Sequence, residues 1–271
     1  MTIVDLLHAG VLSGMAPIDV RVLLRATLGV NDAYLIAHAG DEVSAQHAAQ
    51  FRVLAARRAA GEPVAYIVGE REFYAHVFKV TPAVLIPRPE TELLVELALS
   101  RNPKNILDLG TGSGCIAISI ALSQPSARVT ALDRSDAALA VARQNAALLK
   151  ACNVTFLSSD WFDAVRGQCF DIIVSNPPYV AADDAHLMQG DLRFEPACAL
   201  AAGVDGLADI RRIVAGARAY LARGGWLLFE HGHEQAPQCR KLLLHAGFSE
   251  VQSWRDLAGI ERVSGGSAPS L

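Results

Sequence analysis

The sequence lacks the features that mark membrane, secreted and DNA-binding proteins. No apolar run reaches the roughly 18 residues of a membrane-spanning helix. The first residues carry no basic cluster ahead of an apolar stretch, so we expect no secretory signal. Positive charge is in deficit, with 24 Lys and Arg against 28 Asp and Glu and a formal net charge of −4. A dedicated duplex-DNA binder needs clustered positive charge, so we expect neither a membrane nor a nucleic-acid partner.

Paired cysteines are also missing. The five cysteines are Cys115, Cys152, Cys169, Cys198 and Cys239. Their number is odd and no two form a C-x-x-C motif, which argues against a disulfide framework and a structural zinc site. We expect five buried or half-buried thiols in a reducing cytoplasmic compartment, and no metal site.

The apolar content is high enough for a large folded core. Hydrophobic residues make up 52% of the 271-residue chain and charged residues 19%, which excludes a disordered protein and allows two unequal domains. Residues 1–68 have apolar residues at helical spacing and predict an all-helical domain. Within it, Asp32 is expected to cap a helix over Ala33–His38, and Ser44 a longer helix that runs to Arg58.

The remainder of the chain changes from helical to alternating patterns. Residues 69–87 are rich in β-formers and predict a β-hairpin connector in which Pro82 begins a turn. Residues 88–271 alternate strands and helices, which predicts an α/β domain with a mostly parallel sheet covered on both faces. The tail Gly265–Leu271 is expected to be mobile. The expected strands are Asn105–Leu109, Arg128–Asp133, Asn153–Leu157, Asp171–Ser175, Gly225–Glu230 and an antiparallel pair, Phe248–Trp254 and Ile260–Ser264. The expected helices are Thr91–Leu99, Ser113–Ser123, a helix capped by Ser135 that runs to Leu149, Leu207–Leu221 and Glu234–Ala246.

A glycine-rich loop follows the first of these strands and opens a helix. Such a loop lets the backbone approach a ligand closely. It is not a dinucleotide fingerprint, because Cys115 stands where the third glycine belongs, and it lacks the lysine of a phosphate-binding loop. Asp108 before the loop is expected to order it. The loop residues are Gly110, Thr111, Gly112, Ser113 and Gly114.

An acidic residue ends the second expected strand. Asp133 is placed to accept hydrogen bonds from both hydroxyls of a ribose. Taken alone, the acid could be a charge at a helix N-terminus, and the loop a tight turn without a ligand. Together they predict a nucleoside ligand without pyrophosphate, and S-adenosylmethionine is such a ligand.

The most specific motif is Asn176-Pro177-Pro178-Tyr179, directly after a buried-type strand. Two prolines end the strand and remove two N–H donors, so the loop offers acceptors with few competing donors. The Asn176 side-chain oxygen and the Pro177 carbonyl can hold both N–H bonds of an –NH₂ group, while Tyr179 supplies a flat face. This arrangement suits an amide or exocyclic amine that is presented to an electrophile.

The motifs resemble those of the HemK/PrmC family over nearly the whole chain. The resemblance implies a Rossmann-like S-adenosylmethionine-dependent methyltransferase fold with a mostly parallel seven-stranded sheet. It also implies methylation of the glutamine in the Gly-Gly-Gln motif of class 1 peptide-chain release factors, in support of translation termination. One departure is Ala75, where the family usually has glycine. The matching segments are Gly61–Tyr74, Val84–Glu92, Leu94–Glu96, Asp108–Ala117, Ser159–Phe162, Asn176–Val180, Arg193–Pro196, Glu230–Gly232 and Asp256–Val263.

The resemblance assigns roles to the motif residues. It implies that Gly110–Gly114 cradle the methionine part of the cofactor and that Asp133 binds its ribose. Asp160 and Trp161 would flank the adenine, and Asn176 would contact both cofactor and substrate. The substrate amide would be held by Asn176, Pro177, Pro178 and Tyr179, of which Asn176, Pro177 and Tyr179 are the expected catalytic residues.

The sequence leaves the roles of several residues open. Arg88 and Glu90 either close the cofactor pocket or form a structural ion pair, and Arg193 and Glu195 receive no role. No strong general base is evident, because the histidines in 231–233 are interpreted as surface or cap residues. We expect a cytoplasmic monomer whose helical domain grips the protein substrate.

Three other functions remain open from the residues. An adenine amino-methyltransferase of DNA or RNA shares the Asn-Pro-Pro-Tyr motif, although it needs a basic surface or a target-recognition domain. A non-catalytic binding module could retain the fold, although intact Gly110–Gly114 and Asn176 argue against it. A nucleotide-dependent dehydrogenase is disfavoured by Cys115.

Overall fold

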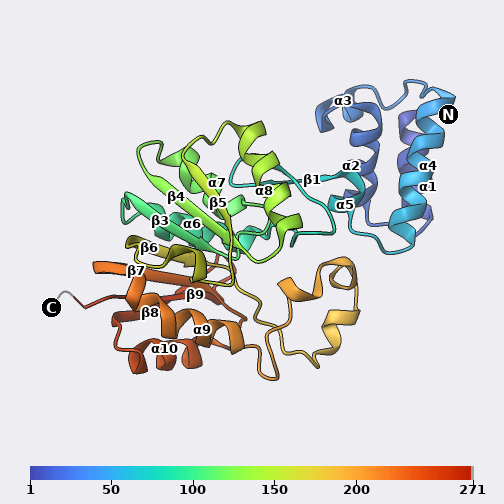
Figure 1. Cartoon of the computed structure of the whole chain (residues 1–271). Coiled ribbons are helices and arrows are strands. Elements are labelled where there is room, and N and C mark those ends of the chain that lie inside the picture. The colour runs from blue at the N-terminus through green and yellow to red at the C-terminus, as the bar shows by residue number, and fades with distance from the viewer. Residues whose placement is uncertain (270–271) are drawn as a thin grey trace. The chain divides into compact units, whose positions relative to one another are not determined.

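The computed structural model describes residues 1–269, which form two compact units. The first unit comprises Met1–Glu70 together with Gln189–Phe194, and the second comprises Arg71–Met188 and the chain from Glu195 onward. Figure 1 shows helices throughout the first unit and a central sheet in the second. No helix within the described range is long and apolar enough to cross a membrane.

The first unit has its own hydrophobic core. Each longer helix buries one side, as the sequence periodicity predicts, and the sides meet around Leu6, Leu23 and Phe51. Its helices are α1 (Ile3–Leu12), α2 (Pro17–Leu28), α3 (Asp32–Ala37), α4 (Ala45–Ala59), α5 (Val64–Val68) and the 3₁₀ helix η4 (Leu192–Phe194).

Side-chain caps set the starts of these helices. The Ser44 hydroxyl accepts the backbone N–H of His47 at 3.2 Å, so the predicted cap of α4 is confirmed. The predicted cap of α3 is wrong by one residue, because Asn31 Oδ1 accepts from the Tyr34 N–H at 2.9 Å. Asp32 is already helical and pairs with two arginines of α2.

A short excursion of the chain belongs to the first unit. Within Gln189–Phe194, Asp191 accepts from Arg58 Nη1 at 2.7 Å, while Arg58 Nε donates to Asp19 at 2.7 Å. Arg193 donates to the C-cap carbonyl of α4 at 2.9 Å. These contacts give Arg193 a structural role that the sequence did not assign.

A two-stranded hairpin precedes the large sheet, formed by β1 (Glu70–Phe73) and β2 (His76–Lys79). Tyr74 and Ala75 make its turn with φ of +49° and +59°. Positive φ at both central residues is the geometry that matches the twist of a hairpin. The family's glycine at position 75 is explained by this conformation. The turn predicted at Pro82 is confirmed as a second, later turn, in which the Val84 N–H donates to the Thr81 carbonyl.

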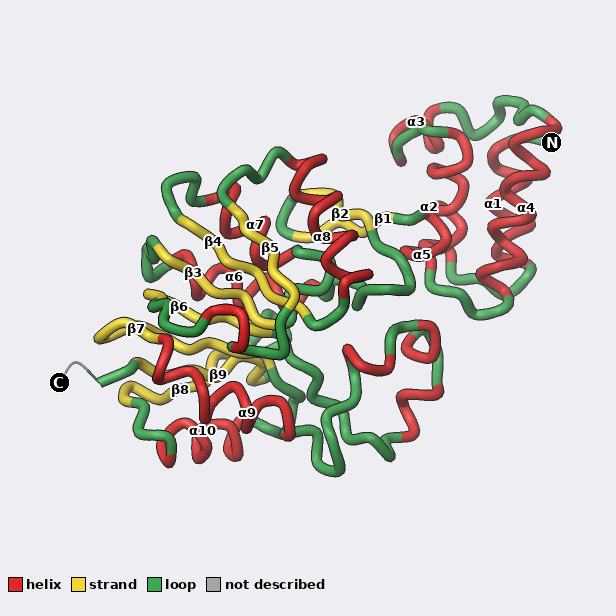
Figure 2. The backbone as a smooth tube through the Cα atoms, viewed as in Figure 1, coloured by secondary structure: helices red, strands yellow, loops and turns green. Residues whose placement is uncertain are grey.

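The second unit is built on a seven-stranded sheet in the order β5-β4-β3-β6-β7-β9-β8. The first five strands in this order are parallel and β9 is antiparallel to both of its neighbours, which confirms the predicted mixed sheet. Figure 2 shows the strands of this sheet, in yellow, side by side. They are β3 (Asn105–Leu109), β4 (Arg128–Asp133), β5 (Val154–Ser158), β6 (Phe170–Ser175), β7 (Leu221–Glu230), β8 (Ser249–Arg255) and β9 (Glu261–Ser267).

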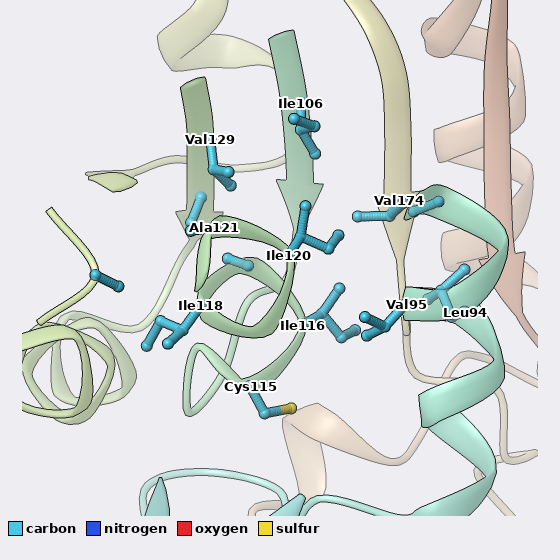
Figure 3. Close-up of a cluster of buried hydrophobic side chains, with 14 of the residues drawn as sticks. Leu94, Val95, Ile106, Cys115, Ile116, Ile118, Ile120, Ala121, Val129 and Val174 are labelled. Atoms are coloured by element: carbon cyan, nitrogen blue, oxygen red, sulfur yellow. The ribbon is translucent and has the colours of Figure 1, made fainter. Parts of the chain in front are cut away.

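Helices cover both faces of the sheet (Figure 1). One core joins α6 and α7 to the sheet, and its buried Val95 and Ile116 lie next to each other in Figure 3. The second core lies under α9 and α10, around Ile173 and Leu243. The helices are α6 (Glu92–Leu99), α7 (Cys115–Ser123), α8 (Asp136–Leu149), α9 (Ala208–Ala217) and α10 (Ala236–His245), with 3₁₀ turns η1 (Pro89–Thr91), η2 (Asp163–Val165), η3 (Ala185–Met188), η5 (Ala197–Ala199) and η6 (Arg218–Tyr220).

Three local predictions are wrong. The tail is not mobile from Gly265 onward, because Gly265–Ser267 complete β9 and are buried; positions 270–271 lie outside the described residues. The helix predicted to reach Leu221 ends at Ala217, since the chain there enters β7. Finally, only two of the free thiols are buried, Cys115 and Cys239, whereas the other three are exposed.

Candidate functional site

A cavity in the second unit opens where β3, β4 and β6 end. In this sheet β3 lies between β4 and β6, so the loops after these strands diverge at its carboxyl edge. Open α/β sheets bind ligands at such points. Of the predicted cofactor residues, the cavity is lined by Gly110, Thr111, Gly112, Ser113, Asp133, Asp160, Trp161 and Asn176.

The glycine loop takes a conformation that ordinary residues avoid. Gly110, Gly112 and Gly114 all have positive φ, at +72°, +55° and +82°. Gly114 does not line the cavity, and its importance is steric: a Cβ there would come within 2.8 Å of Ile118 Cδ1. Gly114 therefore lets α7 start close to its neighbours, while the earlier loop residues face the cavity.

Asp108 is buried beneath this loop. Its Oδ2 accepts the Thr111 hydroxyl at 2.6 Å, so the carboxyl orders the loop as the sequence predicted. Its Oδ1 has no hydrogen-bond partner within the described part of the chain. Burial raises the pKa of Asp108 to about 7, because the charged form loses its hydration.

Asp133 links the loop to the next strand. Its Oδ2 accepts the Gly112 N–H at 2.9 Å and its Oδ1 accepts the Ser135 N–H at 2.9 Å. The bond to Ser135, the N-cap residue of α8, is the role at a helix N-terminus that the sequence also allowed for Asp133. A carboxylate oxygen has two lone pairs, so each oxygen keeps one acceptor site for a ligand in the cavity.

Asp160 and Trp161 line the cavity after β5. Trp161 has φ of +51°, an uncommon conformation for a large side chain, and its carbonyl accepts the Ser159 hydroxyl at 2.9 Å. Asp160 pairs with Arg212 at 2.8 Å. The Trp161 indole ring lies 3.8 Å from where a Cβ atom on Gly110 would stand, so Trp161 and Gly110 bound the same part of the cavity.

The Asn-Pro-Pro-Tyr segment divides between the cavity and the interior. Asn176 and Pro178 line the cavity, whereas Pro177 and Tyr179 are not among its lining residues. Asn176 Nδ2 donates to the Thr91 hydroxyl oxygen at 3.2 Å. Its Oδ1 is buried and has no partner among the described residues. Such an unpaired acceptor is costly unless a ligand uses it.

Tyr179 is turned toward a buried acid. Its hydroxyl donates to Glu230 Oε1 at 3.1 Å, and burial beside this carboxyl raises the pKa of Tyr179. Burial likewise raises the pKa of Glu230, which also accepts from Thr91 at 2.6 Å. The sequence reasoning missed Thr91 and Glu230 as members of this group. The signal was present, since both stand in segments that matched the family.

Another wall of the cavity was only partly foreseen. Arg88 lines it and forms an ion pair with Glu195, whose carboxylate also accepts the Ile86 N–H at 3.0 Å. Pro196, Cys198 and Ala199 then continue the wall. Arg88 thus lines the cavity and forms a structural ion pair, although with Glu195, whereas Glu90 is exposed and does not line the cavity.

The histidines have different surroundings from those expected. His231 is buried rather than on the surface, and lies outside the cavity lining. Its Nδ1 bonds the Gly232 carbonyl and its Nε2 meets the Ser264 hydroxyl, both at 2.8 Å. Burial lowers the pKa of His231, which favours a neutral structural imidazole. His233 is exposed next to Glu234. Between residues 1 and 269, no group of three or more His, Cys, Asp or Glu residues could hold a metal ion.

The cavity fits S-adenosylmethionine by the chemistry of its walls. Asp133 brings carboxylate oxygens to the cavity and Trp161 an aromatic ring, and these groups suit hydroxyl donors and a purine, respectively. The open glycine loop leaves room for a methionine tail. Asn176 lines the same cavity, and its buried Oδ1, which has no partner among the described residues, suits an incoming N–H donor.

Comparisons with known proteins agree with this picture. Residues 5–69 match the family model "PrmC N-terminal domain" and residues 89–197 match "Methyltransferase small domain". A release factor glutamine methyltransferase of Bordetella pertussis is 55% identical, with 93% of this chain and 95% of that protein covered. One of Burkholderia pseudomallei is 52% identical over 99% of this chain and 96% of its own length.

Solved structures show the fold. A 16S rRNA N2-G1207 methyltransferase of T. thermophilus, solved with AdoMet and guanosine, superposes with a TM-score of 0.54. It is 22% identical, and the match covers 73% of this chain and 49% of that one. At this identity the likeness concerns the methyltransferase fold alone.

Proposed function

Because the chain belongs to the release factor glutamine methyltransferase family, we propose that it methylates the glutamine of the Gly-Gly-Gln segment in class 1 peptide-chain release factors. The methyl donor is S-adenosylmethionine, and the acceptor is the side-chain amide nitrogen. The observation that carries this proposal is that Asn176 lines the cavity beside the glycine loop and that its buried Oδ1 has no partner within residues 1–269.

The cofactor is held by residues after three strands. Gly110–Ser113 receive its methionine part, and Asp133 accepts from the ribose hydroxyls. Asp160 and Trp161 bound the adenine. When bound, S-adenosylmethionine supplies a sulfonium methyl group, which is an activated electrophilic carbon.

The substrate amide needs help because its nitrogen lone pair is delocalised into the carbonyl. We assign one N–H of the substrate –NH₂ group to Asn176 Oδ1 and the other to the carbonyl of the adjacent Pro177, although Pro177 lies outside the cavity lining. These bonds strengthen as positive charge builds on nitrogen, so they stabilise the transition state more than the ground state. Pro178 bounds the cavity beside Asn176, and the two also orient the nitrogen toward the methyl, which contributes a proximity effect of several kcal/mol.

Tyr179 plays a supporting part in this proposal. The sequence placed it directly on the substrate amide, whereas its hydroxyl is engaged by Glu230. We assign it to the wall behind the amide, with its ring as the flat face. As the nitrogen lone pair forms the bond to the methyl carbon, the sulfur–methyl bond would break and leave its electron pair on the thioether product. No histidine lines the cavity as a base, so the proton leaves the nitrogen to solvent.

The two units divide the work. Residues 1–68, together with the excursion Gln189–Phe194, grip the release factor, 69–87 form the connector, and the remainder of 88–271 performs catalysis. The protein acts as a monomer in the cytoplasm, where release factors operate.

A labelling experiment tests the proposal. The purified protein is incubated with methyl-labelled S-adenosylmethionine and a class 1 release factor, and the product is mapped by mass spectrometry. We expect one added methyl on the glutamine of Gly-Gly-Gln. A release factor with Gln→Ala at this position is the matched control and should stay unlabelled.

The same assay separates the alternatives. Label in added RNA or DNA, with none in the release factor, would replace the proposal with a nucleic-acid amino-methyltransferase. Calorimetry without any S-adenosylmethionine binding would favour the non-catalytic module.

A further inference from the structure

Two buried polar side chains contact the Asn-Pro-Pro-Tyr segment and have no part in the reaction described so far. Thr91 ends η1 and is 2% exposed, while Glu230 ends β7 and is 1% exposed. Strands β6 and β7 are parallel with Ser175 opposite Phe229. The next residues, Asn176 just after β6 and Glu230 at the end of β7, therefore occupy neighbouring positions.

A chain of hydrogen bonds connects these residues. The Thr91 hydroxyl donates to Glu230 Oε2 at 2.6 Å, and the Tyr179 hydroxyl donates to Glu230 Oε1 at 3.1 Å. Asn176 Nδ2 then donates to the Thr91 oxygen at 3.2 Å. Each oxygen of the Glu230 carboxylate thus accepts one hydroxyl.

The direction of these bonds determines which way the Asn176 amide faces. Both hydroxyls donate to Glu230, so its carboxyl serves as an acceptor at each oxygen and the single hydroxyl hydrogen of Thr91 points at Glu230. Only lone pairs of Thr91 then remain for Asn176, which must present its –NH₂ group to them. The Asn176 oxygen is consequently left on the other side, where it has no partner among the described residues.

We propose that Glu230 is a positioning residue that acts through Thr91 to orient the Asn176 amide, so that its oxygen rather than its –NH₂ group meets the substrate nitrogen. This inference rests on the function proposed above and adds a determinant of its geometry. An Asn176 amide turned by half a rotation would point two donors at the substrate –NH₂ group, and would remove the acceptor on which the reaction depends.

A purely structural bridge would not require an acid. A glutamine at position 230 has nearly the same shape and could also join Thr91 to Tyr179. It differs because its –NH₂ end can donate to Thr91, which frees the Thr91 hydroxyl to donate to Asn176 Oδ1. Glu230→Gln therefore permits the wrong amide orientation while the surrounding packing is retained.

Thr91 offers a matched pair of variants. Thr91→Val keeps the shape of the side chain but removes its oxygen, whereas Thr91→Ser keeps the hydroxyl and loses only a methyl group. We expect kcat to fall about 10-fold or more in Thr91→Val and Glu230→Gln, the scale of one misplaced hydrogen bond to a reacting group. Thr91→Ser should retain most of the wild-type kcat.

The measurements separate positioning from stability and binding. KM for the release factor, the Kd of S-adenosylmethionine by calorimetry and Tm are determined for each variant, and the loss should concentrate in kcat. A Thr91→Val enzyme with wild-type kcat, or a Thr91→Ser enzyme as slow as Thr91→Val, would overturn the proposal. If Glu230→Gln does not fold, the Thr91 pair still decides.

A spectroscopic readout is independent of turnover. In the protein without cofactor, the side-chain –NH₂ resonances of Asn176 are assigned by their loss in Asn176→Ala. They should move in Thr91→Val and in Glu230→Gln, and stay near their wild-type positions in Thr91→Ser. Resonances that move in neither of the first two variants would refute the orienting role. A wild-type protein that leaves release factor unmethylated would instead refute the proposed function.

Discussion

The backbone N–H of Gly112 donates to Asp133 Oδ2 across 2.9 Å, which ties the glycine loop after β3 to the acid that ends β4. One side chain thus shapes the loop and retains acceptor sites for a ligand. The two predicted parts of the nucleoside site form a single hydrogen-bonded unit.

Removing this acid should weaken cofactor binding. In Asp133→Ala the ribose loses a charged acceptor and Gly112 loses its partner, so we expect the Kd of S-adenosylmethionine to rise about 10-fold or more. Calorimetry measures the effect. Asp136→Asn is the control, since Asp136 is exposed and outside the cavity. Equal affinity of Asp133→Ala and wild type would contradict this role.

Loss of the Asn176 acceptor should act on the rate. Asn176→Ala removes the oxygen that stabilises the developing charge on the substrate nitrogen, so kcat is expected to fall about 100-fold or more. Steady-state kinetics with a release factor measure this, with circular dichroism to verify the fold. Turnover close to wild type in a folded variant would exclude Asn176 from the chemistry.

The pair of Arg88 and Glu195 should contribute to stability beside the cavity. The Glu195 side chain is fully buried, so Arg88→Met leaves its charge uncompensated and should lower the free energy of unfolding by about 3 kcal/mol. Adding Glu195→Gln should restore part of the loss, because the amide oxygen still accepts from Ile86. Urea unfolding of both single variants and the double variant measures the coupling. Additive losses would show that the two residues act independently.

Asp108 should make stability depend on pH. Its pKa rises from the ordinary value of 3.8 to about 7 in the folded protein, so the folded state holds the proton more tightly. This contribution is present below the unfolded pKa and is lost as the pH rises through 7, by up to roughly 4 kcal/mol. Asp108→Asn cannot ionise and should lose less stability between about pH 4 and pH 8. Urea unfolding along this range tests it, and parallel pH profiles would disprove the assignment.

The hairpin turn offers a stabilising change. Ala75 has φ of +59°, where a side chain costs about 1 kcal/mol relative to glycine. Ala75→Gly should therefore raise the free energy of unfolding by about that amount. Gly69→Ala is a control with the opposite expected sign. Gly69 has φ of +78° and no atom within 4 Å of an added Cβ, so the fall in the free energy of unfolding reports the backbone conformation alone. A destabilised Ala75→Gly protein would mean that the methyl group packs usefully.

Local patterns were sufficient where a single segment decides its own structure. The bounds of β3 and β4 were predicted to the residue, and Ser135 and Ser44 were recognised as caps, because the spacing of apolar residues and the capping chemistry are written within each segment. The tail failed for the opposite reason. Gly265 and Gly266 carry no strand signal, and they are strand only because β7 and β8 pair with them.

The candidate site divides in the same way. The sequence predicted a nucleoside site and a binding site for an amide, because each motif carries its chemistry in a few neighbouring residues. These motifs are Gly110–Gly114 with Asp133, and Asn176–Tyr179. Only the tertiary structure decided that Tyr179 turns to Glu230, that Glu195 pairs with Arg88, and that Thr91 leaves the Asn176 oxygen unpaired. These partners lie far apart along the chain, so their pairing depends on how the strands and loops pack, which no local pattern encodes.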